Sequence, residues 1–358
     1  MKHIFISLLF LTCGIPTLLS AQNDKFAKVH VGFIYPVSTN GKEAGEYTND
    51  FSFNVLAGLS KNEKNFSLCG LAGIIRDTAS GLQIAGFSNT ILHHADGIQI
   101  AGFLNYVKNS AGRLQIAGFT NINGRFDGLQ IAGFTNINGR SDGLQIAGFA
   151  NLSKKTTTGL QLSGFINTGS DLHMQVAGFF NKAAKVRGMQ IAGFMNIADS
   201  SEYPIGFLNI IKNGERSVSL SIDETLTSLV SFRSGSRHLF GILGAGYNWT
   251  KDQSLYAFEA GLGAHLIHSG NFQLNTEVAE IWLTKFEGGE YLRSALRLLP
   301  SLKLGSRIEI FCGPSFNYVY SKGDIGANLV SHYVWSETKS DYFQGLYFGV
   351  MGGVQINL

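Results

Sequence analysis

The chain has 358 residues, of which 44 are glycine, 15% are charged and 12% are aromatic, and its formal net charge is +3. Soluble domains carry about 25% charged residues, so an ordinary solvated surface is disfavoured. The basic residues are dispersed, which argues against a nucleic-acid-binding face, and beyond the N-terminus no run approaches the ~18 apolar residues of a spanning helix.

The N-terminus has the layout of a secretory signal peptide. Lys2 and His3 precede an apolar run, and Leu19-Ser20-Ala21 precedes the polar Gln22. We therefore expect residues 1–21 to be removed. A lipid anchor at Cys13 is the alternative, but the preceding residues match a lipobox poorly. Cys69 and Cys312 are then the remaining cysteines, too few for a disulfide framework.

A tandem repeat occupies the region 66–211. The motif Gly81-Leu82-Gln83-Ile84-Ala85-Gly86-Phe87-Ser88-Asn89 returns in near-copies every 14 to 16 residues up to Asn196. This period is too short for a helical repeat and suits one strand followed by a tight turn. Each copy is predicted to be a β element.

Read at period two, each copy has two faces. Leu82, Ile84, Gly86, Ser88 and Thr90 share one face, whose fourth position varies freely between copies, and Gln83, Ala85, Phe87 and Asn89 share the other. Free variation in volume favours contact with fluid lipid over a packed core, where one methylene is felt. A tilted strand of about ten residues spans roughly 25 Å, the apolar height of an outer-membrane barrel.

Alternating strands of the same kind follow the repeats. We predict them at 239–248, 256–266, 271–284, 291–303, 307–320 and 346–358, with two more at 29–35 and 51–60 ahead of the repeats. Asn123-Gly124 and Asn138-Gly139 are typical hairpin turns. The primary prediction is therefore an all-β fold in which 22–358 forms one transmembrane antiparallel up-and-down barrel of about 18–20 strands.

A β-solenoid of 15–16-residue rungs, followed by barrel-like strands, is the alternative fold. In it the Gln and Asn side chains would stack as ladders, and Gly86 would form a corner that separates Leu82 and Ile84 from Phe87.

The barrel prediction assigns a set of side chains to the lumen. From the repeats and from the C-terminal strands these are Gln83, Phe87, Asn89, Gln130, Phe134, Asn136, Glu259, Glu277, Arg293, Arg297 and Glu309. The charged members form either a solute-selecting constriction or a set of cross-strand ion pairs. The row of phenylalanines, one per repeat, is either a ligand platform or filler that narrows the lumen.

The sequence carries none of the common catalytic or cofactor-binding motifs. No GxSxG elbow, Walker loop or HExxH occurs. The adjacent His93 and His94 are the only histidine cluster and favour a solvated loop over a metal site. We therefore expect no enzyme activity, no metal and no cofactor.

The repeat motif resembles that of the bacterial surface-repeat proteins of diderm organisms, whose members carry a signal peptide and arrays of this kind. The resemblance covers Gly81 to Asn196 closely and implies a surface or outer-membrane location, but it brings no activity or functional residues. Gly353, Ile356 and Leu358 also resemble the C-terminal targeting signal of outer-membrane barrels, although a terminal aromatic is more usual.

Together these observations predict an exported, non-catalytic outer-membrane protein. It would act as a pore for small polar solutes or as a structural surface protein, with membrane lipid and the barrel-assembly machinery as its partners. A surface-exposed solenoid adhesin or binding module is the alternative function.

Overall fold

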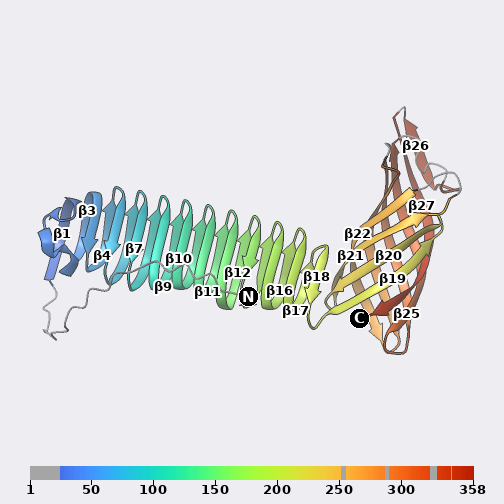
Figure 1. Ribbon diagram of the computed structural model, residues 1–358, viewed down its shortest axis with the longest axis horizontal. Coiled ribbons are helices and arrows are strands. Elements are labelled where there is room, and N and C mark those ends of the chain that lie inside the picture. Colours follow the sequence, from blue (N-terminus) through green and yellow to red (C-terminus); the bar gives the residue numbers. More distant parts are fainter. Residues whose placement is uncertain (1–24, 251–254, 287–289, 323–328, 340) are drawn as a thin grey trace, which may run out of the picture.

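The computed structural model describes residues 25–250, 255–286, 290–322, 329–339 and 341–358, and in it the chain forms two separate β-sheets (Figure 1). The predicted signal peptide, residues 1–21, lies outside the described residues. The all-β prediction is confirmed. The prediction of one barrel over 22–358 is wrong, because the first sheet, up to Ile211, is a parallel solenoid and only the second closes on itself.

The solenoid contains eighteen strands and one short 3-10 helix. They are β1 (Lys25–Ile34), β2 (Val37–Ser38), η1 (Gly41–Glu46), β3 (Tyr47–Ser60), β4 (Asn62–Cys69), β5 (Ala72–Ile75), β6 (Thr78–Ala85), β7 (Ser88–Ile91), β8 (His94–Ala101), β9 (Leu104–Ala117), β10 (Thr120–Ala132), β11 (Thr135–Ala147), β12 (Ala150–Ser163), β13 (Ile166–Thr168), β14 (Asp171–Leu172), β15 (Met174–Ala177), β16 (Phe180–Ala192), β17 (Met195–Ile205) and β18 (Leu208–Ile211).

Each repeat copy is one rung that stacks in parallel on the previous copy. Thr120 of β10 pairs with Thr135 of β11, and the register continues to Ala132 and Ala147. This arrangement matches the alternative prediction of a solenoid. The predicted hairpin turn at Asn123-Gly124 is wrong: both residues lie within β10, where the rung bends around its corner.

A glycine makes the opposite corner of each rung possible. A Cβ on Gly118 would collide with the carbonyl oxygen of Gly102 in the preceding rung. Between corners, side chains alternate: Gln130 and Ala132 are buried inside the rung, whereas Leu129 and Ile131 point outward. The interior of the solenoid is thus narrow and combines buried Gln and Asn side chains with alanines and an apolar cluster that includes Ile91, Val107 and Phe126. Its two broad outer faces are mainly apolar.

The second sheet is an eight-stranded antiparallel barrel, closed by pairing between its first and last strands, with one further strand on its rim. The strands are β19 (Glu215–Asp223), β20 (Thr227–Gly235), β21 (Leu239–Asn248), β22 (Leu255–Ser269), β23 (Phe272–Thr284), β24 (Glu290–Leu304), β25 (Ile308–Lys322), β26 (Trp335–Lys339), which pairs only with β27, and β27 (Tyr342–Asn357). The six C-terminal strands predicted from the sequence correspond to β21–β25 and β27.

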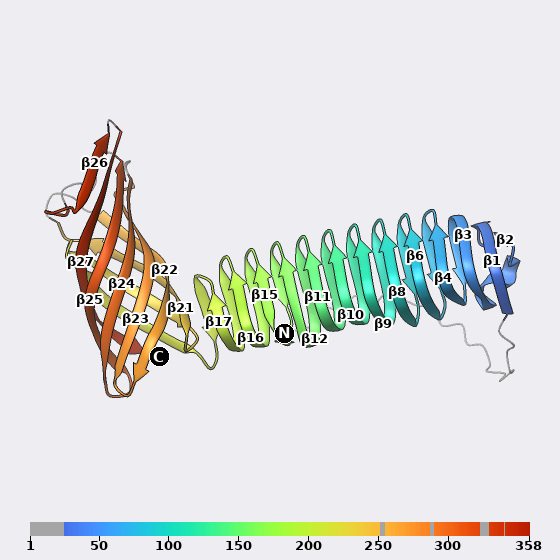
Figure 2. The same ribbon diagram turned by 180° about the vertical axis from the view of Figure 1, so that it is seen from behind.

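The two ends of the barrel differ. Short turns after Gly235, Ser269 and Leu304 join strands at one end, which we call the short-turn end. The strand ends at Asn248, Thr284 and Lys322 lie at the other end, which we call the long-loop end, together with β26 (Figure 2).

The last rung of the solenoid packs against the outside of the barrel near the short-turn end. The backbone N–H of Asn209 donates to Ser234 Oγ at 3.0 Å, and Ser236 Oγ donates to the carbonyl of Glu202 at 2.8 Å. Gly241 of β21 faces the last rung, where a Cβ would collide with the carbonyl oxygen of Gly206. The long axis of the solenoid runs across that of the barrel in both views (Figures 1 and 2).

Candidate functional site

The predicted Asn residues form a continuous ladder inside the solenoid. Asn89 Nδ2 donates to Asn105 Oδ1 at 3.0 Å, and the same bond recurs at 2.9 Å between Asn121 and Asn136. Each amide also donates to a backbone carbonyl across the rung, as Asn136 does to Ile146 at 2.9 Å. The ladder continues to Asn209. Asn89 and Asn136 therefore face a packed interior, and the predicted aqueous lumen at these positions is wrong.

The predicted Gln residues form a second, parallel ladder. Gln145 Nε2 donates to Gln130 Oε1 at 3.2 Å, and Gln99 Nε2 donates to Gln83 Oε1 at 3.0 Å. The ladder ends at Gln190, because Pro204 occupies the matching position in the next rung. Buried amides must find partners, and stacking identical residues supplies most of them from rung to rung. The row of Gln bonds is interrupted between Gln99 and Gln115, where Gln115 pairs with Asn123 instead.

The phenylalanines are placed differently from the prediction. Phe87 and Phe134 are not on the face of the Gln and Asn residues: they lie on the rung corner, 51% and 40% exposed. The corner at Gly86 breaks the period-two alternation, so that Phe87 turns outward. Neighbouring rings stack with centroids 4.7–5.1 Å apart. We call this set the phenylalanine row: Phe87, Phe103, Phe119, Phe134, Phe149, Phe165, Phe179 and Phe194.

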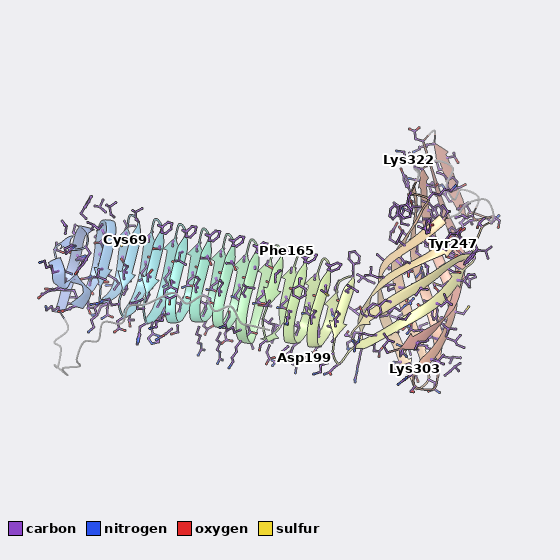
Figure 3. The ribbon with its side chains drawn as sticks, in the orientation of Figure 1. Cys69, Phe165, Asp199, Tyr247, Lys303 and Lys322 are labelled. Carbon is purple, nitrogen blue, oxygen red and sulfur yellow. The ribbon has the colours of Figure 1, made fainter. Side chains whose placement is uncertain are left out.

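Charged residues collect on the narrow edge opposite the phenylalanine row. Figure 3 labels one residue on each edge, Phe165 and Asp199. We define the charged edge as the segments 92–97, 107–113, 123–128, 138–143, 153–159, 169–173, 183–188, 198–202 and residue 212. Ion pairs form along it, such as Arg113 with Asp96 at 2.9 Å.

Near its N-terminal end the solenoid buries a carboxyl group. Glu63 is 3% exposed and accepts hydrogen bonds from Asn49 Nδ2 at 3.0 Å and from Ser52 Oγ at 2.8 Å. Burial raises the pKa of Glu63 to about 6, against the opposing effect of these hydrogen bonds.

Inside the barrel, four of the predicted charged residues take part in buried ion pairs or hydrogen bonds near its middle and short-turn end. Arg297 Nη1 lies 2.6 Å from Glu259 Oε1 and 3.2 Å from Glu277 Oε2. Glu277 also pairs with Arg233 at 2.8 Å. Glu309 accepts a hydrogen bond from Ser301. All these charged side chains are less than a tenth exposed, so the arrangement matches the ion-pair interpretation.

Towards the long-loop end, the fifth predicted residue belongs to a separate cluster. Arg293 pairs with Asp223 at 2.5 Å and donates to the hydroxyl of Tyr347 at 3.2 Å. Buried apolar side chains surround this point, and Leu329, Val330 and Tyr333 pack against them from the connection before β26. Apolar side chains therefore close this end of the barrel.

An eight-stranded barrel is about wide enough for its own side chains. The prediction of a wide channel depended on 16 or more strands and is wrong for this barrel, because the first eighteen strands build the solenoid instead.

Sequence reasoning missed Arg233 and Asp223. Asp223 lies on β19 and Arg233 lies on β20. The alternating serines of these two strands were not recognised as a strand pattern. The sequence signal that could have found Arg233 is its spacing of two and four residues from Ser231 and Leu229, which places all three side chains on the same face of a strand.

The two adjacent histidines contact neighbouring polar side chains. His93 Nδ1 lies 3.3 Å from Asp77, and His94 Nδ1 lies 2.6 Å from Ser110 Oγ. Over the described ranges, no group of three or more potential ligands could hold a metal ion. Within the same ranges, no helix has the length and apolar character needed to cross a membrane.

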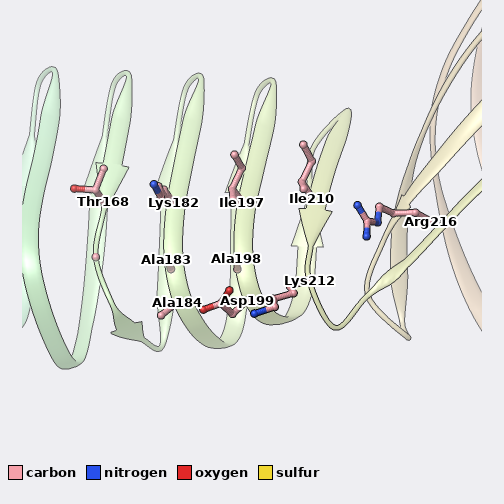
Figure 4. A pocket seen from close by; sticks show the side chains of 11 residues that line it. Thr168, Lys182, Ala183, Ala184, Ile197, Ala198, Asp199, Ile210, Lys212 and Arg216 are labelled. Atoms are coloured by element: carbon pink, nitrogen blue, oxygen red, sulfur yellow. The ribbon is translucent and has the colours of Figure 1, made fainter. Parts of the chain in front are cut away.

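An open hollow of about 640 Å³ lies where the solenoid meets the barrel (Figure 4). Lys182, Asp199, Lys212 and the barrel residue Arg216 line it together with apolar side chains of the last rungs. Comparisons of the chain with protein-family models, with curated proteins and with solved structures find no match.

Proposed function

We propose that the chain is a non-catalytic structural protein of the bacterial outer membrane, in which the barrel of residues 215–358 is the membrane anchor. The observation that carries the proposal is the inverted polarity of the barrel. Its ion pairs are buried inside, whereas Leu220, Val278 and Phe348 on its outer wall are 62%, 60% and 72% exposed.

Further features of the outer wall support this anchor. Aromatic side chains contact one another near the long-loop end, among them Tyr247 with Trp249 and Phe258 with Trp282. Such girdles are typical of membrane interfaces. Glu280, a charged residue on the outward face within a strand, accepts a hydrogen bond from Ser294 Oγ at 2.6 Å. Outer-membrane barrels have short periplasmic turns and longer external loops, so the short-turn end would face the periplasm.

The test is the behaviour of the purified, refolded chain in detergent and in planar bilayers. We expect migration that changes on heating, dependence on detergent and no ion conductance, since the ion pairs and the apolar cluster fill the interior. A chain that stays monomeric and folded without detergent after signal removal would contradict the anchor. Steady single-channel conductance would contradict the closed interior.

A second candidate function is a surface-exposed solenoid adhesin or binding module. The regular spacing of the phenylalanine row favours it, because stacked exposed rings offer a repetitive binding strip. Proteolysis of intact cells separates the two: cleavage at the charged edge by external trypsin supports the adhesin.

A further inference from the structure

We propose that the solenoid lies in the lipid leaflet next to the short-turn end of the barrel, with both broad faces and the phenylalanine row in contact with acyl chains and the charged edge in the headgroup layer. This inference rests on the proposed function of the barrel as an outer-membrane anchor.

The first argument is the segregation of charge around each rung. The stretches from Leu82 to Thr90 and from Leu129 to Ile137 contain no Asp, Glu, Lys or Arg, and the other copies follow the same pattern. Every charged residue between Leu82 and Ile211 falls in the charged edge, with Lys182 as the exception. Lys182 is the last residue before the next charged segment, so its long side chain can reach the polar layer.

The second argument is the size and shape of the apolar surface. Nine rungs at the ~4.8 Å spacing of paired strands give a length of roughly 40 Å. Soluble monomers rarely expose a contiguous apolar patch of more than a few hundred Å². Here three contiguous surfaces are mainly apolar: the two broad faces, one of which also carries Ser88, Thr90, Thr168 and Lys182, and the edge between them. A single protein partner would have to wrap around three sides, whereas lipid surrounds them without a matching shape.

The third argument comes from the outward positions that follow the phenylalanine row. They vary in volume from rung to rung, as in the partly exposed Ser88, Leu104 and Phe180, without any matching change in the interior ladder. A packed interface between proteins would restrict these volumes. Fluid acyl chains do not.

The fourth argument concerns the backbone, which must be fully hydrogen-bonded in hydrocarbon. The N–H groups at the rung corners meet this requirement, because they bond to carbonyls of the previous rung. Gly118 N–H donates to Ala101 at 3.1 Å, and Phe119 N–H donates to Phe103 at 3.1 Å. The Phe119 carbonyl in turn accepts from Phe134 and Thr135 at 2.9 and 3.1 Å. The N–H groups of the exposed corner and its phenylalanine carbonyl are therefore paired within the stack.

The fifth argument is the placement of the solenoid on the barrel. The last rung packs on the outer wall at Gly241, where the proposed anchor would otherwise meet acyl chains. In Figure 3, Asp199 on the charged edge lies toward the same side as Lys303 near the short-turn end, and Phe165 lies on the opposite side of the solenoid. The charged edge would thus reach the headgroups while the phenylalanine row points toward the middle of the bilayer.

The experiment uses nitroxide labels on the full-length protein in phospholipid vesicles, with oxygen as the apolar relaxation reagent and a nickel chelate as the polar one. Wild-type protein carries the barrel control, because Cys312 is exposed and Cys69 is buried. Three further variants place the label in a Cys312→Ser background: Phe149→Cys on the phenylalanine row, Leu160→Cys on a broad face and Lys154→Cys on the charged edge.

We expect the ratio of oxygen to nickel accessibility to be several-fold higher at positions 149, 160 and 312 than at position 154. If position 312 is protected from nickel but 149 and 160 are as accessible to nickel as 154, the barrel anchor stands and the immersion of the solenoid is wrong. If position 312 is itself accessible to nickel, the proposed anchor fails first. Spin coupling between copies at 149 would show a protein partner and would also overturn the lipid contact.

Discussion

Asn136 donates from Nδ2 to Oδ1 of Asn151, 2.9 Å away in the next rung toward the C-terminus. The Gln ladder beside it runs the other way, since Gln145 donates back to Gln130. Within the Asn ladder each inner amide donates to the next residue and accepts from the previous one. The removal of one side-chain amide therefore breaks hydrogen bonds to both neighbouring rungs.

Asn136→Ala should therefore destabilise the solenoid by about 2 to 4 kcal/mol, because an unsatisfied buried polar group costs about 1–3 kcal/mol and this change affects both the Asn121 amide and the Ile146 carbonyl. Pulse proteolysis in a urea series measures it. Ile137→Thr is the matched control, since the next residue points outward and Thr90 and Thr168 occupy the same position in other copies. Equal losses in the two variants would contradict a role of the ladder in stability.

Glu63 predicts a pH dependence at the N-terminal end of the solenoid. Its pKa in the folded chain is raised by burial to about 6 from 4.5, so its contribution to stability is complete below pH 4.5 and is lost as the pH rises through 6. The loss amounts to about 2 kcal/mol. Hydrogen exchange of β3 and β4, corrected for intrinsic rates, should show faster opening at pH 7 than at pH 4.5.

Glu63→Gln should remove this dependence, because the amide stays neutral and its oxygen can still accept from Asn49 or Ser52. Glu43→Gln, an exposed change on the same end of the chain, should leave it intact. A pH profile that survives Glu63→Gln would assign the effect to another group.

Glu277 is central to the buried ion pairs of the barrel. Glu277→Gln leaves Arg233 and Arg297 with one fewer counter-charge inside the barrel, and breaking a buried pair typically costs about 3–5 kcal/mol. We expect a clear fall in the temperature at which the folded band converts to the unfolded band on gels. Glu280→Gln, three residues further on the same strand but outward, should change it little; a similar fall in both would contradict the network.

The close packing of the last rung against Gly241 should hold the solenoid on the barrel. Gly241→Leu places a side chain where the carbonyl oxygens of Gly206 and Phe207 lie, so the last rung must move away from the barrel. Trypsin should then cleave faster after the exposed Lys212. Ala245→Leu lies on the same strand and points outward away from the junction, and it should leave the cleavage rate unchanged. Unaltered cleavage in Gly241→Leu would show that the contact does not hold the two sheets together.

The repeat period and the alternation of Leu82 with Gln83 predicted β elements with opposite faces, and the structure has both. They could not decide between an antiparallel strand with its turn and one parallel rung, because both use about 15 residues and both place Leu82 and Ile84 outward. The decision lies in the stacking of Gly118 on Gly102, a contact between residues far apart in sequence. For the same reason the prediction placed Phe87 on the same face as Gln83 and Asn89, which is wrong. The corner at Gly86 turns Phe87 outward, whereas Asn89 points into the interior as Gln83 does.

In the barrel, the inward parity of Glu259, Glu277, Arg293, Arg297 and Glu309 followed from alternation alone. Alternation alone did not predict their ion-pair partners, because Arg297 on β24 reaches across β23 to Glu259 on β22. Which strands neighbour one another depends on how many strands close the barrel, a number that the repeats obscured.

Because each repeat copy forms one rung, the number of copies sets the length of the solenoid. Duplication or loss of a single copy would lengthen or shorten it by about 4.8 Å without changing the barrel, because each rung contacts only its neighbours. Recombination between the DNA segments that encode the copies would therefore change the length of the solenoid in uniform steps while its attachment at Gly241 stays the same.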